Sequence, residues 1–309
     1  ACSESSGGME RFSYELIQTA SASSALSVSK ITHQGSRKTS PVFALLVIPQ
    51  ALIAARNVDF IHIGDPMLSL AGWVIKLVLR KKIVVTVHGL DISYTNYIYQ
   101  LYLRLFFRSF DLYLPISQSV RKELAKHSVK GSVSVINPGT SNDYFDPSIS
   151  RSDLYKLISK PETNAPNQAE VFLLTTGRLV ERKGHAWFIE YVLPHLPTHV
   201  HYIIAGDGPN LPTIKKVIES HQLQSRVHLL GRVSDRNLKI LYNTADAFIQ
   251  PNIKVKGDME GFGLVLLEAA LCNKAVFAAD LEGMMDAIIP GQNGTLVPAE
   301  NQDEWIKAI

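Results

Sequence analysis

Short apolar runs alternate with helical stretches along the chain from about Val58 onward. In the first half the apolar runs are VDFIHIG, KIVVTVHG and LYLPIS, and helices are expected near Leu68–Arg80 and Tyr97–Phe107. Strands that are apolar at nearly every position and are separated by helices are typical of a parallel sheet covered on both faces. The pattern therefore predicts a doubly wound α/β domain.

The alternation lapses between about Phe145 and Glu170, where prolines lie among Ser, Asn and Lys. Such a stretch is typical of a linker, here with a short helix expected in SDLYKLIS. The alternation then resumes, with strands expected in VFLLTTG, HYIIAGDG, VHLLG, AFIQP and AVFAA and helices around Trp187–Leu193, Leu211–Ser220, Arg236–Thr244 and Leu264–Leu271. This second series predicts a second doubly wound domain.

Length and composition agree with two folded domains. A chain of 309 residues suits two domains, which we expect at residues 1–165 and 166–309 with a cleft between them. Hydrophobic residues make up 46% and charged residues 19%, enough apolar surface for folded cores. A formal net charge of +3 is too small to indicate nucleic acid as a partner. Because Cys2 and Cys272 are far apart and no signal segment is evident, we expect a cytoplasmic protein.

Two segments bear on membranes. The apolar run Val42–Ile48 is stopped by Pro49 and is far shorter than the roughly 20 residues that span a bilayer, so we expect no transmembrane helix. The aromatic run YIYQLYLRLFFRSFDLYL carries Arg104 and Arg108. Its helical spacing favours packing against its own sheet, and an amphipathic surface that makes peripheral membrane contact stays open as the alternative.

Ligands of open parallel sheets bind beyond the carboxyl ends of the strands, so the residues after each strand are the first candidates. Arg178 and Lys183 follow the strand VFLLTTG, and Gly206 follows HYIIA. Arg offers a planar fork of donors and Lys a point charge, so together they suit a diphosphate. A solvated helix entrance is the alternative for the same charged loop.

The segment EGFGLVLLE has a carboxylate at each end of an uncharged run. Gly261 and Gly263 let the backbone approach a ligand where the helix begins, and the free N–H groups of that helix suit an anion. We expect Glu260 in the loop before the helix and Glu268 in its second turn, where both can accept hydrogen bonds from sugar hydroxyls. The alternative is a dipole-complementing Glu260 and a surface Glu268, but the LVLLEAAL setting is too apolar for a solvated charge.

Two candidates lie in the first half. His88 follows the strand KIVVTV, which places an imidazole at the carboxyl end of a strand, where a structural and a functional role are equally consistent. Gly7 and Gly8 precede the amphipathic helix MERFSYELIQTA and suit a turn that approaches a phosphate.

Metal sites and common nucleotide motifs are not evident in the sequence. His195, His199 and His201 resemble a metal cluster, but Pro197 breaks a common helix face and no nearby Cys or carboxylate completes a set. The sequence contains no D-x-D pair, P-loop, G-x-S-x-G or G-x-G-x-x-G after a strand. We therefore expect neither a bound metal nor a dinucleotide cofactor.

Six second-half motifs resemble those of one family: GRLVERKGH, AGDGP, VHLLGRVSD, LYNTADAFIQP, EGFGLVLLEAA and IIPGQNGTLVP. They occur in the order and approximate spacing seen in retaining GT-B glycosyltransferases of family four, the group 1 glycosyltransferases. SSGGMERFSYELI and VVTVHGLD extend the resemblance into the first half. It implies two facing Rossmann-like domains, a UDP- or GDP-sugar bound mainly by the second, and a glycan or lipid-linked acceptor bound mainly by the first.

The resemblance also implies a role for each candidate residue. Arg178 and Lys183 would neutralise the donor diphosphate in place of a metal, Glu260 would contact the transferred sugar, and Glu268 would hold the ribose hydroxyls. His88 would lie beside the reacting face of the sugar. The other donor contacts that the resemblance implies are Gly7, Gly8, Gly206, Val233, Gly261, Phe262, Gly263 and Leu264.

The sequence departs from the family pattern at three places. The first domain is expected to lack its first strand and the second its last helices, and EGMMDAI around Glu282 replaces the usual Gly-Gly and Pro-Glu pairs. The leading hypothesis is a retaining, metal-independent hexosyltransferase of cell-surface polysaccharide biosynthesis. The alternatives are a catalytically impaired nucleotide-sugar-binding relative and a nucleotide-sugar epimerase.

Overall fold

A computed structural model describes residues 8–33, 40–141, 143–158 and 170–309. The chain divides into two compact units, Ala1–Pro138 with Gly257–Phe262 and Gly139–Lys256 with Gly263–Ile309. The domain boundary expected between residues 165 and 166 lies outside the described residues. A short segment from late in the sequence, residues 257–262, therefore belongs to the first unit.

The first unit contains a parallel sheet whose described strands are ordered β1-β2-β3-β4. These strands are β1 (Phe60–Ile63), β2 (Lys82–Val87), β3 (Leu112–Pro115) and β4 (Ser132–Val133). The helices are α1 (Gly8–Ala22), α2 (Ser40–Ala54), α3 (Ser69–Leu79), α4 (Leu90–Ser93), α5 (Tyr97–Phe106) and α6 (Gln118–Ala125). Ile83, Val85 and Val87 are fully buried, as expected for a central strand.

The second unit contains a parallel sheet ordered β10-β9-β8-β5-β6-β7. Its strands are β5 (Val171–Thr176), β6 (Val200–Ala205), β7 (Val227–Gly231), β8 (Ala247–Gln250), β9 (Ala275–Ala279) and β10 (Thr295–Val297). The helices are α7 (Arg151–Leu157), α8 (His185–Trp187), α9 (Leu211–Ser220), α10 (Asp235–Thr244), α11 (Leu264–Leu271), α12 (Met284–Ala287) and α13 (Gln302–Ala308).

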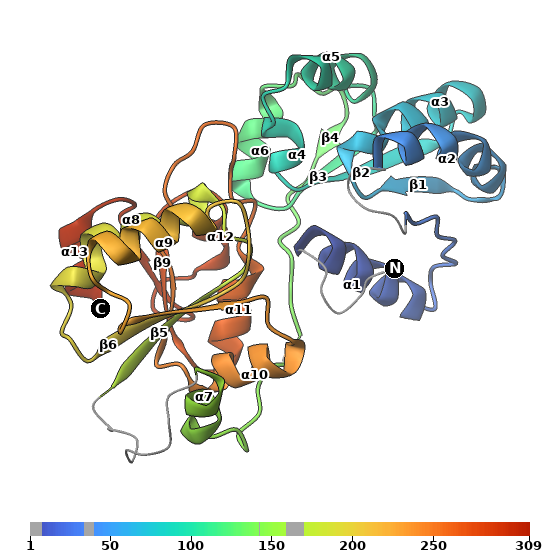
Figure 1. Ribbon diagram of the computed structural model, residues 1–309. Helices are drawn as coiled ribbons and strands as arrows, with labels where there is room; N and C mark the ends of the chain where they lie inside the picture. Colours follow the sequence, from blue (N-terminus) through green and yellow to red (C-terminus); the bar gives the residue numbers. More distant parts are fainter. Residues whose placement is uncertain (1–7, 34–39, 142, 159–169) are drawn as a thin grey trace. The chain divides into compact units, whose positions relative to one another are not determined.

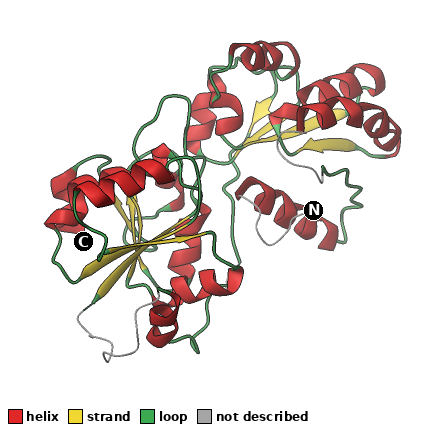
Figure 2. Cartoon of the chain, viewed as in Figure 1, coloured by secondary structure: helices red, strands yellow, loops and turns green. Residues whose placement is uncertain are grey.

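The strand order of the second sheet is that of a Rossmann fold. The chain builds β5, β6 and β7 in one direction and then returns to place β8, β9 and β10 on the other side of β5. Helices α8 and α9 lie on one face of the sheet and α10 and α11 on the other (Figures 1 and 2). Every residue of β6 is buried, because both faces of this central strand are covered. The prediction of two doubly wound domains is confirmed.

Helix α2 differs from the expectation that Pro49 stops the apolar run. The helix continues from Ser40 to Ala54 with Pro49 inside it. Proline lacks the N–H that would donate to the carbonyl of Leu45. Leu45 lies on the exposed side of the helix, so solvent can satisfy this carbonyl and the helix persists. Within the described part of the chain, no helix is both long enough and apolar enough to cross a membrane.

The helix predicted near Trp187–Leu193 is irregular. It begins as α8, continues through a π-helical turn at Phe188–Val192 and ends in a 3-10 turn at Leu193–His195. Pro194 lacks an amide donor at this point, which is one reason why the regular ladder does not continue.

Candidate functional site

The second sheet has a topological switch point between β5 and β8. The two strands are neighbours in the sheet, and the connections that follow them run to opposite faces, so the carboxyl ends of the strands border a crevice in folds of this type. Arg178 and Lys183 follow β5, Gly206 follows β6, Val233 follows β7, and Glu268 lies in the second turn of α11, which follows β8. The second-unit residues selected from the sequence thus lie in the segments that follow the strands.

The loops after β5 and β6 are fixed against each other by their backbones. Gly177 N donates to Ala205 O at 2.9 Å, and Leu179 N donates to Asp207 O at 3.0 Å. A Cβ atom on Gly206 would lie 1.8 Å from Gly177 O, so only glycine fits at this contact. A Cβ on Gly177 would instead meet no atom within 4 Å. The backbone at Gly177 therefore faces open space where a ligand can approach.

Lys183 is a buried cation at the junction of the loops after β5 and β8. Lys183 is only 7% exposed to solvent, whereas Arg178 is exposed. The backbone of the same turn is tied to the segment after β8, because Ile253 N donates to Arg182 O at 2.9 Å. The alternative of a solvated helix entrance therefore describes Arg178 but not Lys183.

A neutral histidine lies close to this cation. Burial, with the positive charge of Lys183 adding to it, lowers the pKa of His185 to about 3. The His185 Nδ1 atom lies 3.0 Å from Tyr202 Oη, with which it shares a hydrogen bond. Because His185 stays neutral, Lys183 carries the buried positive charge of this turn.

Gly184 holds the Lys183 turn against the segment after β8, and its replacement by alanine is expected to destabilise the protein. Its φ is +67°, and a Cβ atom would lie 1.8 Å from Pro251 O. We expect Gly184→Ala to lower the free energy of unfolding by about 2–4 kcal/mol, measured by urea unfolding. Gly231→Ala is the matched control, since its φ is +64° but no atom lies within 4 Å of its Cβ. It should cost only about 1 kcal/mol; equal losses would contradict the steric explanation.

Glu268 is buried and is held by a tyrosine. The residue is 5% exposed, and Tyr242 Oη donates to Glu268 Oε2 at 2.7 Å. The same Tyr242 hydroxyl lies 2.9 Å from Thr176 Oγ1, at the last residue of β5. Burial first, and then the negative charge of Glu268, raises the pKa of Tyr242 well above its usual value, so the phenol stays protonated. The surface position considered for Glu268 is therefore wrong.

Sequence reasoning missed Tyr242 and Thr176 as members of the site. Tyr242 lies in the motif LYNTADAFIQP, which was recognised only as part of the family pattern. A tyrosine beside the apolar positions of an amphipathic helix was the available signal, because a buried phenol needs a hydrogen-bond partner.

His88 lies at the carboxyl end of β2 in the first unit, as predicted. The backbone N–H of His88 donates to Asp91 Oδ2 at 2.8 Å, and the backbone N–H of Gly89 donates to Asp91 Oδ1 at 2.7 Å. The His88 ring lies with Nε2 3.1 Å from Gly64 O and meets the Phe12 ring edge-on at 5.4 Å between centroids. The imidazole is therefore oriented by contacts on two sides.

Asp91 fixes the turn that carries His88, and the sequence analysis did not select it. Burial, with the negative charge of Asp65 adding to it, raises the pKa of Asp91 to about 7, although hydrogen bonds from the backbone N–H groups of His88, Gly89 and Asp91 itself oppose the rise. Its signal in the sequence was an aspartate three residues after the histidine, a spacing that lets a carboxylate accept backbone hydrogen bonds at a turn. The carboxyl group can change its charge near neutral pH.

The segment Gly257–Phe262, which carries Glu260, packs on the same turn. A Cβ atom on Gly261 would lie 2.1 Å from His88 O, and one on Gly89 would lie 3.2 Å from Met259 Cγ. Glu260 is buried within this segment. Close backbone approach thus explains Gly261, and it places Glu260 in the same compact unit as His88.

The other candidate glycines differ in their local structure. Gly263 has a φ of +92° and is the residue after which α11 begins at Leu264, while Phe262 is buried just before it. Gly8 is the first residue of α1 rather than part of a turn before it, and open space surrounds its Cβ position. Gly7 lies outside the described residues.

Among the residues that the structure describes, no group of three or more His, Cys, Asp or Glu side chains could hold a metal ion. Of the three histidines considered for a metal, His201 lies in β6 and contacts Glu170 and His228 instead. The His201 Nε2 to Glu170 Oε1 distance is 3.3 Å, and His201 Nδ1 lies 3.3 Å from His228 Nε2. These contacts occur near the amino end of the sheet.

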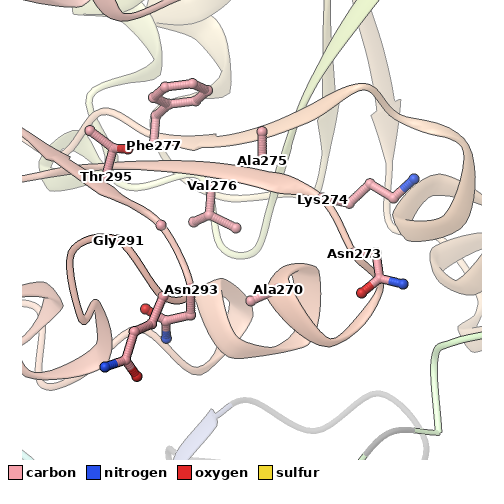
Figure 3. A pocket seen from close by; sticks show the side chains of 11 residues that line it. Ala270, Asn273, Lys274, Ala275, Val276, Phe277, Gly291, Asn293 and Thr295 are labelled. Atoms are coloured by element: carbon pink, nitrogen blue, oxygen red, sulfur yellow. The ribbon is translucent and has the colours of Figure 1, made fainter.

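A cavity of about 450 Å³ also lies near the amino ends of strands. It is bordered by the end of α11 at Ala270, the start of β9 at Ala275 and Val276, and the loop before β10 at Asn293 (Figure 3). It contains none of the residues selected from the sequence. In parallel sheets, ligands bind at the carboxyl ends of the strands, which is the end where the cations and Glu268 lie.

Comparisons with known proteins match both halves of the chain. The family described as glycosyl transferases group 1 matches residues 158–309, and the family described as Glycosyltransferase Family 4 matches residues 25–144. The putative colanic acid biosynthesis glycosyltransferase WcaL of Escherichia coli (strain K12) is 29% identical over 72% of this chain and 52% of its own length. The chain thus spans about half of that relative.

A plant relative and a solved structure extend the comparison. A phosphatidylinositol N-acetylglucosaminyltransferase subunit from Arabidopsis thaliana is 28% identical over 48% of this chain and 32% of its own length. The crystal structure of Anabaena Alr3699/HepE in complex with UDP-glucose has a TM-score of 0.73 at 20% identity, covering 99% of this chain and 86% of that one. This likeness is one of fold.

Proposed function

This chain belongs to the group 1 glycosyltransferases and has their GT-B fold of two Rossmann-like domains, and from that premise we propose its reaction. It moves a hexosyl unit from a nucleotide-diphosphate sugar to a glycan or glycolipid acceptor, with retention of the anomeric configuration and without a metal ion. The second unit binds the nucleotide diphosphate.

One observation carries this proposal: the hydrogen-bonded series Thr176, Tyr242 and Glu268. It connects a buried carboxylate on α11 to the last residue of β5, directly before the loop that carries the two cations. A carboxylate that accepts hydroxyl donors suits a ribose, and cations on the following loop suit the diphosphate attached to that ribose. Both parts of a nucleotide diphosphate thus have chemically matched groups at one end of the sheet.

The chemistry of glycosyl transfer explains why the cations matter. Cleavage of the bond between the anomeric carbon and the phosphate oxygen leaves negative charge on the departing diphosphate. A cation buried like Lys183 acts at a lower effective dielectric than a solvated one, so it stabilises that charge more strongly. Arg178 is exposed and can add two parallel hydrogen bonds to a phosphate.

Residues of the first unit are proposed to act on the sugar. Glu260 contacts the hydroxyls of the transferred hexose, and His88 lies beside its reacting face, where its orientation is set by Gly64 and the Asp91 turn. The acceptor hydroxyl attacks from the side of the leaving group, and the departing phosphate takes its proton. Bond making and proton transfer then require no metal.

The relatives bear on the choice of donor and acceptor. One similar fold was solved with UDP-glucose, and the curated relatives are named for colanic acid biosynthesis and for N-acetylglucosamine transfer to phosphatidylinositol. A UDP-sugar is therefore the first donor to test, with a GDP-sugar second. A surface-polysaccharide or glycolipid pathway is the proposed setting.

The proposal is tested by calorimetry with UDP-, GDP- and ADP-sugars, followed by product analysis of each mixture. We expect tight binding of one nucleotide class, and slow release of free sugar from its bound donor in the absence of acceptor. Conversion of the donor into a different nucleotide sugar would instead identify an epimerase. No binding of any donor by a sample that unfolds cooperatively would contradict the proposed function.

A further inference from the structure

Helix α5 in the first unit is apolar on two sides. Its inner face buries Leu103 and the adjoining Phe107 completely, which agrees with the core packing expected from the sequence. Its outer face carries large apolar residues as well. Tyr97 is 81% exposed and Ile98 76% exposed, and Leu101 and Leu105 continue the same stripe at helical spacing. Core packing therefore explains only half of this helix.

A polar cavity of about 670 Å³ adjoins this stripe. Residues of α4, α5 and α6 line it, and its positive charges come from Arg104 of α5, from Arg108 just after α5 and from Lys126 just after α6. Glu123, which pairs with Lys126, is the acidic residue on its wall. Burial lowers the pKa of His127, although the hydrogen bond that its ring shares with Ile92 O opposes this effect. The cavity is thus net positive.

The surrounding surface has the same sign. Between residues 112 and 130 the chain carries Arg121, Lys122, Lys126 and Lys130 against the single acidic residue Glu123. Arg121, Lys122 and Lys130 are all exposed. An apolar stripe bordered by cations is complementary to a surface that presents acyl chains below a layer of phosphates.

A second exposed apolar surface provides a comparison. Helix α2 exposes Leu46 by 73% and Ile53 by a similar fraction, but it contains no charged residue. Helix α2 thus exposes apolar residues alone, whereas α5 exposes apolar residues beside cations, so the two helices can be compared. Nothing in the structure indicates what covers α2.

We propose that the first unit docks on an anionic bilayer through α5. Tyr97, Ile98, Leu101 and Leu105 enter the interface between headgroups and acyl chains, while Arg104, Arg108 and Lys126 bind lipid phosphates in the adjoining cavity. This inference concerns a surface of the first unit and does not depend on the donor-binding residues of the second.

Vesicle co-sedimentation of the full chain tests the docking. We expect binding to phosphatidylcholine vesicles that contain about one third phosphatidylglycerol, and at least 10-fold weaker binding to pure phosphatidylcholine. Raising the salt concentration to about 0.5 M should weaken binding, because the cations are partly exposed. The variant Arg104→Gln/Arg108→Gln/Lys126→Gln should lose about 100-fold in affinity for the anionic vesicles.

The apolar stripe is tested separately. Tyr97→Ser/Ile98→Ser should weaken binding to anionic vesicles about 10-fold or more, whereas the matched control Leu46→Ser/Ile53→Ser on α2 should leave it unchanged. All four positions are exposed, so melting temperatures should stay close to that of the unchanged protein. Calorimetry with the preferred nucleotide sugar should give the same affinity for every variant, which separates this test from that of the proposed function.

Three results would overturn the inference. They are equal binding to neutral and anionic vesicles, equal loss on substituting α2 and α5, and no vesicle binding by the folded chain. Light scattering that shows a dimer, lost on substitution of α5 and unaffected by vesicles, would assign the stripe to a second copy of the chain instead.

Discussion

Replacing Lys183 by methionine is expected to lower the turnover number for glycosyl transfer about 1000-fold, with a smaller loss of donor affinity. The cation is buried beside the loop after β8, so its charge acts on the leaving diphosphate with little screening by water. Methionine keeps most of the aliphatic stem and removes only the charge. A 1000-fold loss corresponds to about 4 kcal/mol of transition-state stabilisation. Steady-state kinetics with the preferred donor measure it.

The control for this prediction is Lys216→Met on α9. Lys216 is an exposed lysine of the same unit, so its loss removes one positive charge without touching the loop after β5. It should change turnover less than twofold if local charge, rather than net charge, matters. Equal kinetics for the two variants would refute the role of Lys183. A collapse of the Lys183→Met melting temperature would instead show that this cation is needed for folding.

Changing each of the two carboxylates of EGFGLVLLE to glutamine is expected to affect a different property, nucleotide affinity in one case and turnover in the other. Glu268→Gln should weaken binding of the free nucleoside diphosphate about 30-fold, because hydrogen bonds to a charged acceptor contribute more than those to a neutral one. Tyr242 can still donate to the amide oxygen, so the fold should keep its stability. Turnover at saturating donor should change little. Calorimetry with UDP and GDP gives the affinity.

Glu260→Gln should show the opposite profile. Glu260 lies in the segment that packs on the His88 turn, and its proposed partner is the transferred hexose rather than the nucleotide. Affinity for the free nucleoside diphosphate should therefore stay unchanged while turnover falls about 100-fold. The same loss of affinity and turnover in both variants would contradict the division of roles between these carboxylates.

Much of the second unit could be predicted from the sequence because its elements are bounded sharply. Helices α9 and α11 begin and end where they were predicted, since α9 follows the turn residues of GDGP and α11 follows Gly263. The π-helical turn at Phe188–Val192 could not be predicted, because its apolar spacing also fits a regular helix. Pro49 was misleading because the helix continues through it. Whether solvent can satisfy the carbonyl that proline leaves without a donor depends on tertiary packing.

The charged residues of the candidate site could be predicted from the sequence, but the residues that bury and hydrogen-bond them could not. Lys183 and Glu268 stand out in the sequence as charges in informative positions, whereas their burial depends on segments far along the chain. Tyr242 is separated from Glu268 by 26 positions, and only the fold brings their side chains together. Long-range pairs of this kind leave no local periodicity, so a single sequence does not reveal them.

The segment Gly257–Phe262 has a consequence for the order in which the protein is made. Domains generally fold as they emerge from the ribosome, beginning at the N-terminus. Here the backbone of the His88 turn meets Gly261, which is synthesised 173 residues later, counting from position 88 to position 261. The first unit cannot complete its contacts until residues Gly139–Lys256 of the second unit have been translated. The nascent first unit therefore keeps that turn uncovered until the segment Gly257–Phe262 has been synthesised.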